Sequence, residues 1–479
     1  MAFPLSPLSV NYGHILLPTR LETAAEERDD ATNSTLPVED GAPPRKSAFS
    51  GAVGAAPDPI LSIRDAFLAD GSEAKLNLAV GVYRTAEGHP YVLPSVKLAE
   101  QKLLDDLMCG TADKEYLPPD GLQPFCEASL QLLLGNTTDP SRVVAAQSLS
   151  GTGALHLAAR VIAEMIPGAT VYLPQPTWPI HADIFGTVGL RVAYYPYYDP
   201  HTCGLRAAEM IAALRSLPKG GVVLLHACAH NPTGVDPTPQ HWEAVADVLH
   251  ERRLIPLIDS AYQGLASGDL WQDGAGARTI AARGGEMLIC QSFSKNMGLY
   301  GERAGVFSML CSDAVVASRV REQLKRIIRV TYSSPPRHGA ALACRVLCER
   351  ELRDAWTAEV AGMAARLLEM RTVLFAALER VRCPPPHGTD LKSWSHVLTQ
   401  RGMFTYTGLR PEQVLTLREE HHIYMPMDGR ISMAGLSVES CDKLAKAINA
   451  ALRCGTNEEA GGTSGASSEL CSQSKRARV

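Results

Sequence analysis

Short apolar runs alternate with segments of helical periodicity along the middle of this 479-residue chain, and this alternation is what most constrains its fold. Each run of four to six residues has the length of one buried strand, and a helix after each strand can return the chain to the same sheet. The pattern therefore predicts an α/β fold with a largely parallel sheet. The runs are residues 143–146, 170–173, 222–225, 254–258 and 287–290.

Polar residues, or residues that include Gly and Pro, follow each of these runs directly. Ligands of open α/β sheets bind outside the carboxyl ends of the strands, so reactive residues gathered at several strand ends indicate a binding or catalytic site. The segments that follow the runs are residues 150–153, 176–178, 226–234, 259–262 and 292–295.

The pattern changes in the last third of the chain, which indicates a second domain. Residues 345–379 carry apolar side chains at helical spacing and predict one long helix. Residues 402–408, 423–427 and 429–435 predict short strands, and residues 438–452 predict a final helix. We expect this part to form a smaller α+β domain.

Both ends of the chain differ in composition from the middle. Residues 1–46 become acidic and polar after Arg20, and residues 457–479 are rich in Gly, Ser and Glu. Such segments bury too little apolar surface to offset chain entropy, so we expect both to be disordered. The basic end from Lys475 to Arg478 is expected to be a solvated terminus, with nuclear import or anion contact as the alternative.

Composition argues against several classes of function. A net charge of −5 at pH 7 argues against a nucleic-acid partner, and no apolar run approaches the ~20 residues that span a bilayer. The twelve cysteines include no CxxC motif, and we expect free thiols, also for Cys344 and Cys348, which stand four residues apart. His226 and His230 flank Cys228 without the spacing of a zinc motif, so no metal site is expected.

Three features at the strand ends can carry chemistry. The residues from Ser150 to Gly153 precede an amphipathic segment, and their backbone N–H groups favour an anion site and a simple helix cap equally. Asp259 ends an apolar strand, where its carboxylate either needs a cationic partner or caps the next helix. Lys295 lies at a strand exit, where it is either an amine nucleophile with a lowered pKa or a solvated charge.

The joint pattern of these motifs resembles a known family. The segment from Ser292 to Gly305 is similar to the pyridoxal-phosphate lysine region of class I aminotransferases, and more narrowly of their aspartate aminotransferase branch. The resemblance implies a fold-type-I pyridoxal-phosphate-dependent transferase. It implies a large domain of residues 90–364, with a mostly parallel sheet flanked by helices, and a small α+β domain of residues 47–89 and 365–456. The matching motifs are residues 77–84, 116–118, 147–155, 176–178, 226–234, 259–264, 292–305, 329–334 and 429–431.

The resemblance also implies catalytic roles. Lys295 would be the Schiff-base lysine and the base that moves the α-proton of the substrate. Asp259, supported by His181, would pair with the protonated pyridine nitrogen of the cofactor. Tyr262 and Asn231 would donate hydrogen bonds to the 3′-oxygen of the cofactor.

The cofactor ring and phosphate would have further partners. Trp178 would stack on the face of the ring. The phosphate would be bound by small residues, a hydroxyl and a guanidinium, with one residue of the partner subunit reaching in. In this sequence the phosphate ligands are Gly151, Thr152, Ser292 and Arg303, and the residue from the partner is Tyr116.

Two arginines are implied to bind the substrate. Arg430 would hold the α-carboxylate, assisted by Asn231, Trp178 and the backbone near Gly81. Arg329 of the second subunit would bind the side-chain carboxylate of a dicarboxylic substrate. The resemblance thus implies a homodimer whose active sites are shared across the interface.

The implied reaction is a ping-pong transamination in which L-aspartate and 2-oxoglutarate give oxaloacetate and L-glutamate. Three positions depart from the family pattern. Ser334 stands where aspartate-selective members usually carry Asn, Tyr332 stands where Trp is frequent, and Ala79 replaces a frequent Gly. The alternative is therefore a broad-specificity aminotransferase that also accepts aromatic amino acids.

A non-catalytic scaffold that binds partners through its tails is the alternative from another class of protein. Loss of Lys295, Asp259 or Arg430 would favour it, and all three residues are present. The N-terminus lacks the basic start of a secretory signal, and a weak organellar presequence stays open. We expect a cytoplasmic protein, with a mitochondrial location as the alternative.

Overall fold

The chain forms two compact units, Met1–Ala56 and Pro57–Val479. In the first unit a short turn is described, in which the backbone N–H of Ala52 donates to the carbonyl oxygen of Phe49 at 2.9 Å. The expected disorder at both ends concerns residues outside the described part of the chain. The computed structural model describes residues 47–54, 58, 60–85, 87–136 and 138–454.

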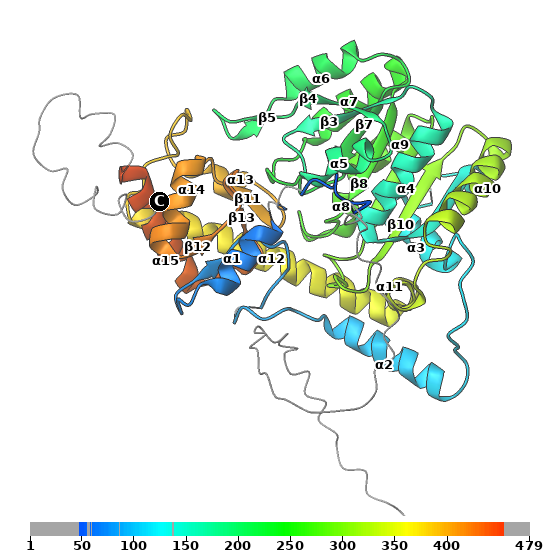
Figure 1. The fold of residues 1–479 in the computed structure, drawn as a ribbon, viewed down its shortest axis with the longest axis horizontal. Helices are drawn as coiled ribbons and strands as arrows, with labels where there is room; N and C mark the ends of the chain where they lie inside the picture. The colour runs from blue at the N-terminus through cyan, green and yellow to red at the C-terminus, as the bar shows by residue number, and fades with distance from the viewer. Residues whose placement is uncertain (1–46, 55–57, 59, 86, 137, 455–479) are drawn as a thin grey trace, which may run out of the picture. The chain divides into compact units, whose positions relative to one another are not determined.

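A seven-stranded sheet organises the second unit (Figure 1). Its strand order is β2-β10-β9-β8-β7-β3-β4. All pairings are parallel except those of β10, which is antiparallel to both β2 and β9. The predicted mostly parallel α/β sheet is therefore confirmed, and each predicted apolar run overlaps one strand. The strands are β2 (Val143–Leu149), β3 (Thr170–Gln175), β4 (Arg191–Pro196), β7 (Val222–His226), β8 (Ile255–Ser260), β9 (Met287–Ser292) and β10 (Ala304–Leu310).

Helices cover both faces of this sheet. On β7, Val222 and Leu224 pack into one apolar cluster and Val223 and Leu225 into another, because successive side chains of a strand point to opposite faces. Every residue of β7 is buried, as is usual for a parallel strand between two helical layers. The first cluster is completed by α4 (Ser150–Met165), α5 (Ile180–Gly186) and α10 (Ala314–Thr331), and the second by α3 (Gln123–Leu134), α6 (Ala207–Ser216), α7 (Pro239–Arg252) and α9 (Ala275–Ala282).

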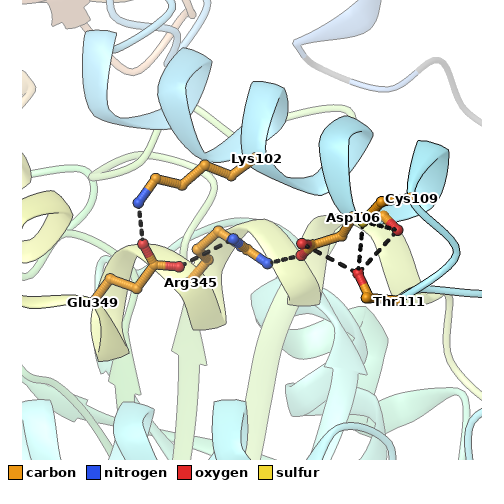
Figure 2. Close-up of polar contacts among 6 residues, drawn as sticks. All are labelled: Lys102, Asp106, Cys109, Thr111, Arg345 and Glu349. Carbon is orange, nitrogen blue, oxygen red and sulfur yellow. Dashed lines mark hydrogen bonds and ion pairs between the residues drawn. The ribbon is translucent and has the colours of Figure 1, made fainter.

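The single helix predicted for residues 345–379 is wrong at its start. Helix α11 (Arg337–Cys348) ends at Cys348, Glu349 is extended, and α12 (Arg350–Arg380) begins afterwards. No Pro or Gly marks this break in the sequence. At the break, the carboxylate of Glu349 pairs with Lys102 of α2 (Pro94–Met108) at 2.5 Å and with Arg345 at 3.2 Å (Figure 2). Lys102 is distant from Glu349 in the sequence, so the apolar periodicity of residues 345–379 does not predict this ion pair or the helix break.

Helix α12 packs against α2 and α11 and also against α15 (Val438–Cys454) (Figure 1). The predicted short strands are present but shorter than expected. β11 (Phe404–Tyr406) pairs antiparallel with β13 (Arg430–Ser432), and β1 (Leu76–Asn77) pairs parallel with β12 (Ile423–Tyr424). The end of the third predicted strand is the 3-10 helix Met433–Gly435.

The residues from Pro57 onward form one compact unit, and the division into domains of residues 90–364 and of residues 47–89 with 365–456 stays a prediction. None of the helices in the described part of the chain has the length and apolar character that crossing a membrane requires. The remaining elements are α1 (Leu61–Ala69), η1 (Pro140–Arg142), β5 (Tyr198–Asp199), β6 (Gly204–Leu205), α8 (Leu270–Asp273), α13 (His396–Thr399) and α14 (Pro411–His421).

Candidate active site

A cavity of about 160 Å³ lies at the carboxyl ends of β7, β8 and β9, beside the start of α4. This is the sheet edge at which the sequence predicts a site. The cavity brings together most of the predicted site residues from segments far apart in the chain. Its lining residues are Ser150, Gly151, Thr152, Leu155, Trp178, His226, Asn231, Asp259, Ala261, Tyr262, Ser292, Ser294, Lys295, Tyr300 and Arg303.

Lys295 follows β9 and points its amine into this cavity. The Nζ atom donates a hydrogen bond to the carbonyl oxygen of Gly81 at 2.7 Å. Burial, together with the positive charges of Arg430 and Arg303, lowers the pKa of Lys295 from 10.5 to about 8. About one tenth of this amine is therefore neutral at pH 7, far more than at the usual pKa of 10.5, and a nucleophile or a proton acceptor requires the neutral form.

Asp259 lies near the end of β8 and is paired in register with His226 of β7. Its carboxylate accepts a hydrogen bond from Nε2 of His181 at 3.2 Å. Burial alone raises the pKa of Asp259, but the hydrogen bond and charge of His181, with a smaller effect of His226, bring this pKa below its usual value. The cavity thus holds a buried, ionised carboxylate that is suited to a cationic ligand group.

Thr177 connects two histidines behind this carboxylate. Its hydroxyl oxygen lies 2.8 Å from Nδ1 of His181 and 3.2 Å from Nε2 of His226. Burial lowers the pKa of His226 to about 3, so its ring is neutral at pH 7. The hydroxyl of Thr177 can accept a hydrogen bond from one ring and donate one to the other, so it links the two histidines. The sequence motif contained Thr177, but nothing in its pattern assigned this role.

The start of α4, together with Ser292 and Ser294, forms a site suited to an anion on another side of the cavity, and we call this site the anion cup. Ser150 has a φ of +60°, and its hydroxyl lies 2.9 Å from that of Ser292 and 2.7 Å from that of Ser294. No side chain caps the N-terminus of α4, so its first backbone N–H groups can bind an anion. β10 can pass beneath Ser150 only because residue 305 is Gly, since a Cβ atom there would lie 2.6 Å from the backbone of Ser150.

Arg303 adds a positive charge to this cup. It lines the cavity, has a φ of +56°, and donates to the carbonyl oxygen of Tyr300 at 3.0 Å. A guanidinium beside hydroxyl and backbone N–H donors is suited to a phosphate dianion. Ser294 completes the cup and was missed by the sequence analysis, although it lies within the motif that contains Lys295.

Arg430 on β13 is buried close to Lys295, with an exposed fraction of 4%. Its Nη1 donates to Oδ1 of Asn231 at 3.1 Å and its Nη2 to the carbonyl oxygen of Ala79 at 2.8 Å. Its buried Nε has no hydrogen-bond partner among the described residues. The Phe404 ring centroid lies 4.1 Å from the guanidinium carbon. The Arg430 guanidinium forms no ion pair with a carboxylate among the described residues, so it is suited to a carboxylate ligand.

Trp178 and Tyr262 also line the cavity. The Trp178 ring meets His181 edge-on with centroids 5.2 Å apart, and the hydroxyl of Tyr262 lies 3.5 Å from Nδ2 of Asn231. Burial raises the pKa of Tyr262, so its hydroxyl stays protonated and can donate a hydrogen bond.

Four predicted residues are not among those that line this cavity. Gly81 and Arg430 lie beside Lys295, since Nζ of Lys295 donates to Gly81 and the charge of Arg430 helps to lower the pKa of Lys295. Tyr116 and Arg329 lie elsewhere in the single chain. Tyr116 is 85% exposed and lines a different surface cavity together with Ser334. Arg329 lies exposed near the end of α10, where its guanidinium contacts the hydroxyl of Ser333. The prediction placed both residues in the site of a second subunit, and it stays a prediction.

The donor set of the cavity fits pyridoxal phosphate. An anion cup matches the phosphate, an ionised carboxylate matches a protonated ring nitrogen, and an amine with a lowered pKa matches an aldehyde. The residues that form these features lie after different strands, and only folding brings them together.

Residues 73–448 match the family model described as aminotransferase class I and II. The chain is 47% identical over 409 residues to the cytoplasmic aspartate aminotransferase of Oryza sativa subsp. japonica, covering 85% of this chain and 98% of the relative. It is 46% identical over 399 residues to the mitochondrial aspartate aminotransferase of Schizosaccharomyces pombe, covering 82% and 88%.

The solved structures that resemble this chain are aminotransferases as well. The broad specificity aminotransferase of Leishmania mexicana is 41% identical with a TM-score of 0.80, covering 85% of this chain and 98% of that one. The aromatic-amino-acid aminotransferase of Burkholderia pseudomallei, covalently bound to pyridoxal phosphate, is 40% identical with a TM-score of 0.79, covering 85% and 100%.

Proposed function

This chain belongs to the aminotransferase class I and II family, and from that premise we propose that it transfers the amino group of L-aspartate to 2-oxoglutarate, giving oxaloacetate and L-glutamate. The observation that carries the proposal is the cavity that holds Lys295, with its lowered pKa, together with the ionised carboxylate of Asp259. The high identity to relatives named aspartate aminotransferase supports aspartate as the amino donor.

The enzyme uses pyridoxal phosphate. When bound, this cofactor supplies an aldehyde that combines with amines and a ring that withdraws electrons from the α-carbon of the substrate. Lys295 would hold the aldehyde carbon and Asp259 the ring nitrogen. The phosphate would lie in the cup formed by the start of α4 and Arg303.

Asp259 would keep a proton on the ring nitrogen. Its carboxylate is ionised, and the chain of hydrogen bonds through His181 and Thr177 fixes its orientation. Tyr262 and Asn231 would donate to the 3′-oxygen of the cofactor, and Trp178 would pack on its ring. These contacts fix the plane of the ring relative to Lys295.

Lys295 would then move the proton of the α-carbon. The neutral Nζ of Lys295 would accept this proton from the α-carbon and donate it to the carbon atom of the cofactor that carries the aldehyde, so one side chain would serve as base and acid. The lowered pKa makes the neutral form available at physiological pH.

Arg430 would bind the α-carboxylate, which amino-acid and 2-oxo-acid substrates share. One clamp therefore serves both half-reactions of a ping-pong mechanism. Asn231, Trp178 and the backbone near Gly81 would complete the grip and orient the α-carbon toward Lys295. For the distal carboxylate we propose Arg329 of a second subunit, with Tyr116 of that subunit at the phosphate. This proposal requires a homodimer.

A broad-specificity aminotransferase is the second candidate. Ser334 in place of the usual Asn favours it, and two structurally similar proteins are a broad specificity and an aromatic-amino-acid aminotransferase. For the location we propose the cytoplasm, with mitochondria as the alternative, since the relatives include a cytoplasmic and a mitochondrial enzyme.

A half-reaction followed by absorbance tests both candidates. Protein loaded with pyridoxal phosphate receives aspartate in one sample and tyrosine or phenylalanine in another. Conversion of the cofactor to its pyridoxamine form by aspartate alone supports an aspartate aminotransferase, and comparable conversion by both supports the broad enzyme. No conversion by any amino acid would overturn both.

A further inference from the structure

Two cysteines of α11 lie with their sulfur atoms close together. Cys344 and Cys348 are one helical turn apart, and their Sγ atoms are 3.8 Å from each other. Cys348 is exposed and Cys344 is partly buried. Neither residue lines the candidate active site. The spacing in the sequence predicts only free thiols, whereas the short distance between the sulfur atoms indicates that both can contact the same ligand.

The backbone separation of this pair argues against a disulfide. Side chains four residues apart on a helix have Cβ atoms about 5–6 Å apart, whereas a disulfide requires about 3.5–4.5 Å. Closing the bond would therefore distort the last turn of α11. A metal ion bound by both sulfurs does not require the short Cβ–Cβ distance of a disulfide. Two sulfurs that each lie about 2.3 Å from a tetrahedral ion are about 3.8 Å apart. The observed distance allows this second geometry without movement of either sulfur atom.

Neighbouring ion pairs hold the last turn of α11 in place. The guanidinium of Arg345 contacts Asp106 of α2, and Glu349 pairs with Lys102 of the same helix (Figure 2). Glu349 also pairs with Arg345 at 3.2 Å. These ion pairs stabilise the backbone around the two cysteines, and because Cys348 is exposed, water can complete the coordination.

We propose that Cys344 and Cys348 form a two-thiolate site for a soft, thiophilic divalent metal ion of the zinc and cadmium type. Binding forms two sulfur–metal bonds, displaces water from the ion and releases one proton from each thiol to the solvent. No electron is transferred, so no oxidant is needed. Burial and the neighbouring Cys348 raise the pKa of Cys344. The ion therefore has to displace the proton of the Cys344 thiol.

Residue-resolved alkylation with Cd²⁺ as the probe tests the proposal on the full-length, cofactor-loaded protein. The protein is reduced, incubated with or without Cd²⁺ in a chelator-free buffer, and treated with a maleimide, after which peptides are quantified by mass spectrometry. We expect Cd²⁺ to slow alkylation of Cys348 at least about tenfold. The internal control is Cys109, an exposed thiol beside Thr111 (Figure 2), whose alkylation should not change.

Variants provide the second readout. Cys344→Ser should remove most of the protection of Cys348, and Cys109→Ser should leave it unchanged. The thiolate-to-cadmium absorbance in the near ultraviolet should fall in parallel. Equal alkylation of Cys348 with and without Cd²⁺ overturns the proposal. It is also overturned if mild peroxide links Cys344 to Cys348 while α11 stays helical, because the geometric argument against a disulfide would then be wrong.

Discussion

The amine of Lys295 lies 2.7 Å from the carbonyl oxygen of Gly81, although 214 residues separate them in the chain. Gly81 belongs to the segment between β1 and α2, whereas Lys295 follows a strand of the large sheet. The ring of Phe404 occupies the space where a side chain at residue 81 would lie, because a Cβ atom there would be 2.8 Å from it. Lys295 therefore lies beside two segments, those of Gly81 and Phe404, that are distant from it in the sequence.

Replacing Lys295 by Ala should abolish transamination. The variant loses both the amine that holds the cofactor and the group that moves the α-proton, and loss of a general base alone lowers rates by about 10²–10⁴-fold. The half-reaction with aspartate measures the loss, and the cofactor absorbance should change in the same variant. Lys97→Ala, at an exposed position on α2, is the matched control and should retain activity. Normal turnover by the Lys295 variant would show that the nucleophile lies elsewhere.

The reactivity of Lys295 should depend on pH with a midpoint near its lowered pKa. Because this pKa is about 8 instead of 10.5, the neutral amine increases through pH 8 in the folded cofactor-free protein. Burying the charged amine destabilises the fold below pH 8, and this effect disappears as pH rises toward 10.5, where the unfolded chain also loses its proton. Competitive labelling with an amine reagent, quantified peptide by peptide, measures the midpoint. A midpoint above pH 10 would contradict the lowered pKa.

Replacing Thr177 by Val should impair catalysis more than folding. The variant keeps the shape of the side chain but removes the hydroxyl shared by His181 and His226. We expect weaker cofactor binding and a several-fold lower kcat, with a stability loss of about 1–3 kcal/mol from the unpaired buried partners. Thr187→Val, which loses one hydrogen bond to Ile184 at the end of α5, is the control. Unchanged cofactor affinity would show that the orientation of Asp259 does not depend on the hydrogen bonds through His181 and Thr177.

Replacing Phe404 by Leu should raise KM for aspartate and for 2-oxoglutarate alike. The ring packs on the Arg430 guanidinium, and a desolvated cation–π contact is worth about 2 kcal/mol, or about 30-fold in affinity. Both substrates carry an α-carboxylate, so both KM values should rise while kcat changes little. Phe307→Leu, in the core of β10, is the control that loses stability without this KM effect. A rise for only one substrate would argue against a shared clamp.

Replacing Arg329 by Ala should distinguish dicarboxylic from aromatic substrates. If Arg329 of a second subunit binds the distal carboxylate, kcat/KM for aspartate should fall at least about a hundredfold, because a desolvated carboxylate loses its partner. The value for phenylalanine should change far less. Parallel steady-state assays of both amino acids provide the measurement, and equal losses would count against the distal clamp.

Much of the fold and of the candidate site was predictable from the sequence. The apolar runs predicted five of the seven strands of the large sheet, because the pattern of a buried parallel strand is local. The residues after those runs, including Lys295 and Asp259, line one cavity as expected. Strands β4 and β10 were not predicted. In β4 the exposed Arg191 and Tyr194 interrupt the apolar pattern of an edge strand. The helix break at Glu349 was also missed, since Lys102, one of its two ionic partners, lies on the distant helix α2.

The sequence by itself determined where strands end, which residues stand at those ends and which family they resemble, because these properties depend on neighbours along the chain. Only the tertiary structure decided the electrostatic properties of the site. The lowered pKa of Lys295 and the hydrogen bonds of Arg430 arise from burial and from distant segments. The 3.8 Å between the sulfur atoms of Cys344 and Cys348 likewise depends on side-chain orientation. Electrostatic and hydrogen-bond energies depend on the distances between groups and on the exclusion of water from them. The spacing of residues in the sequence gives neither the distances nor the burial.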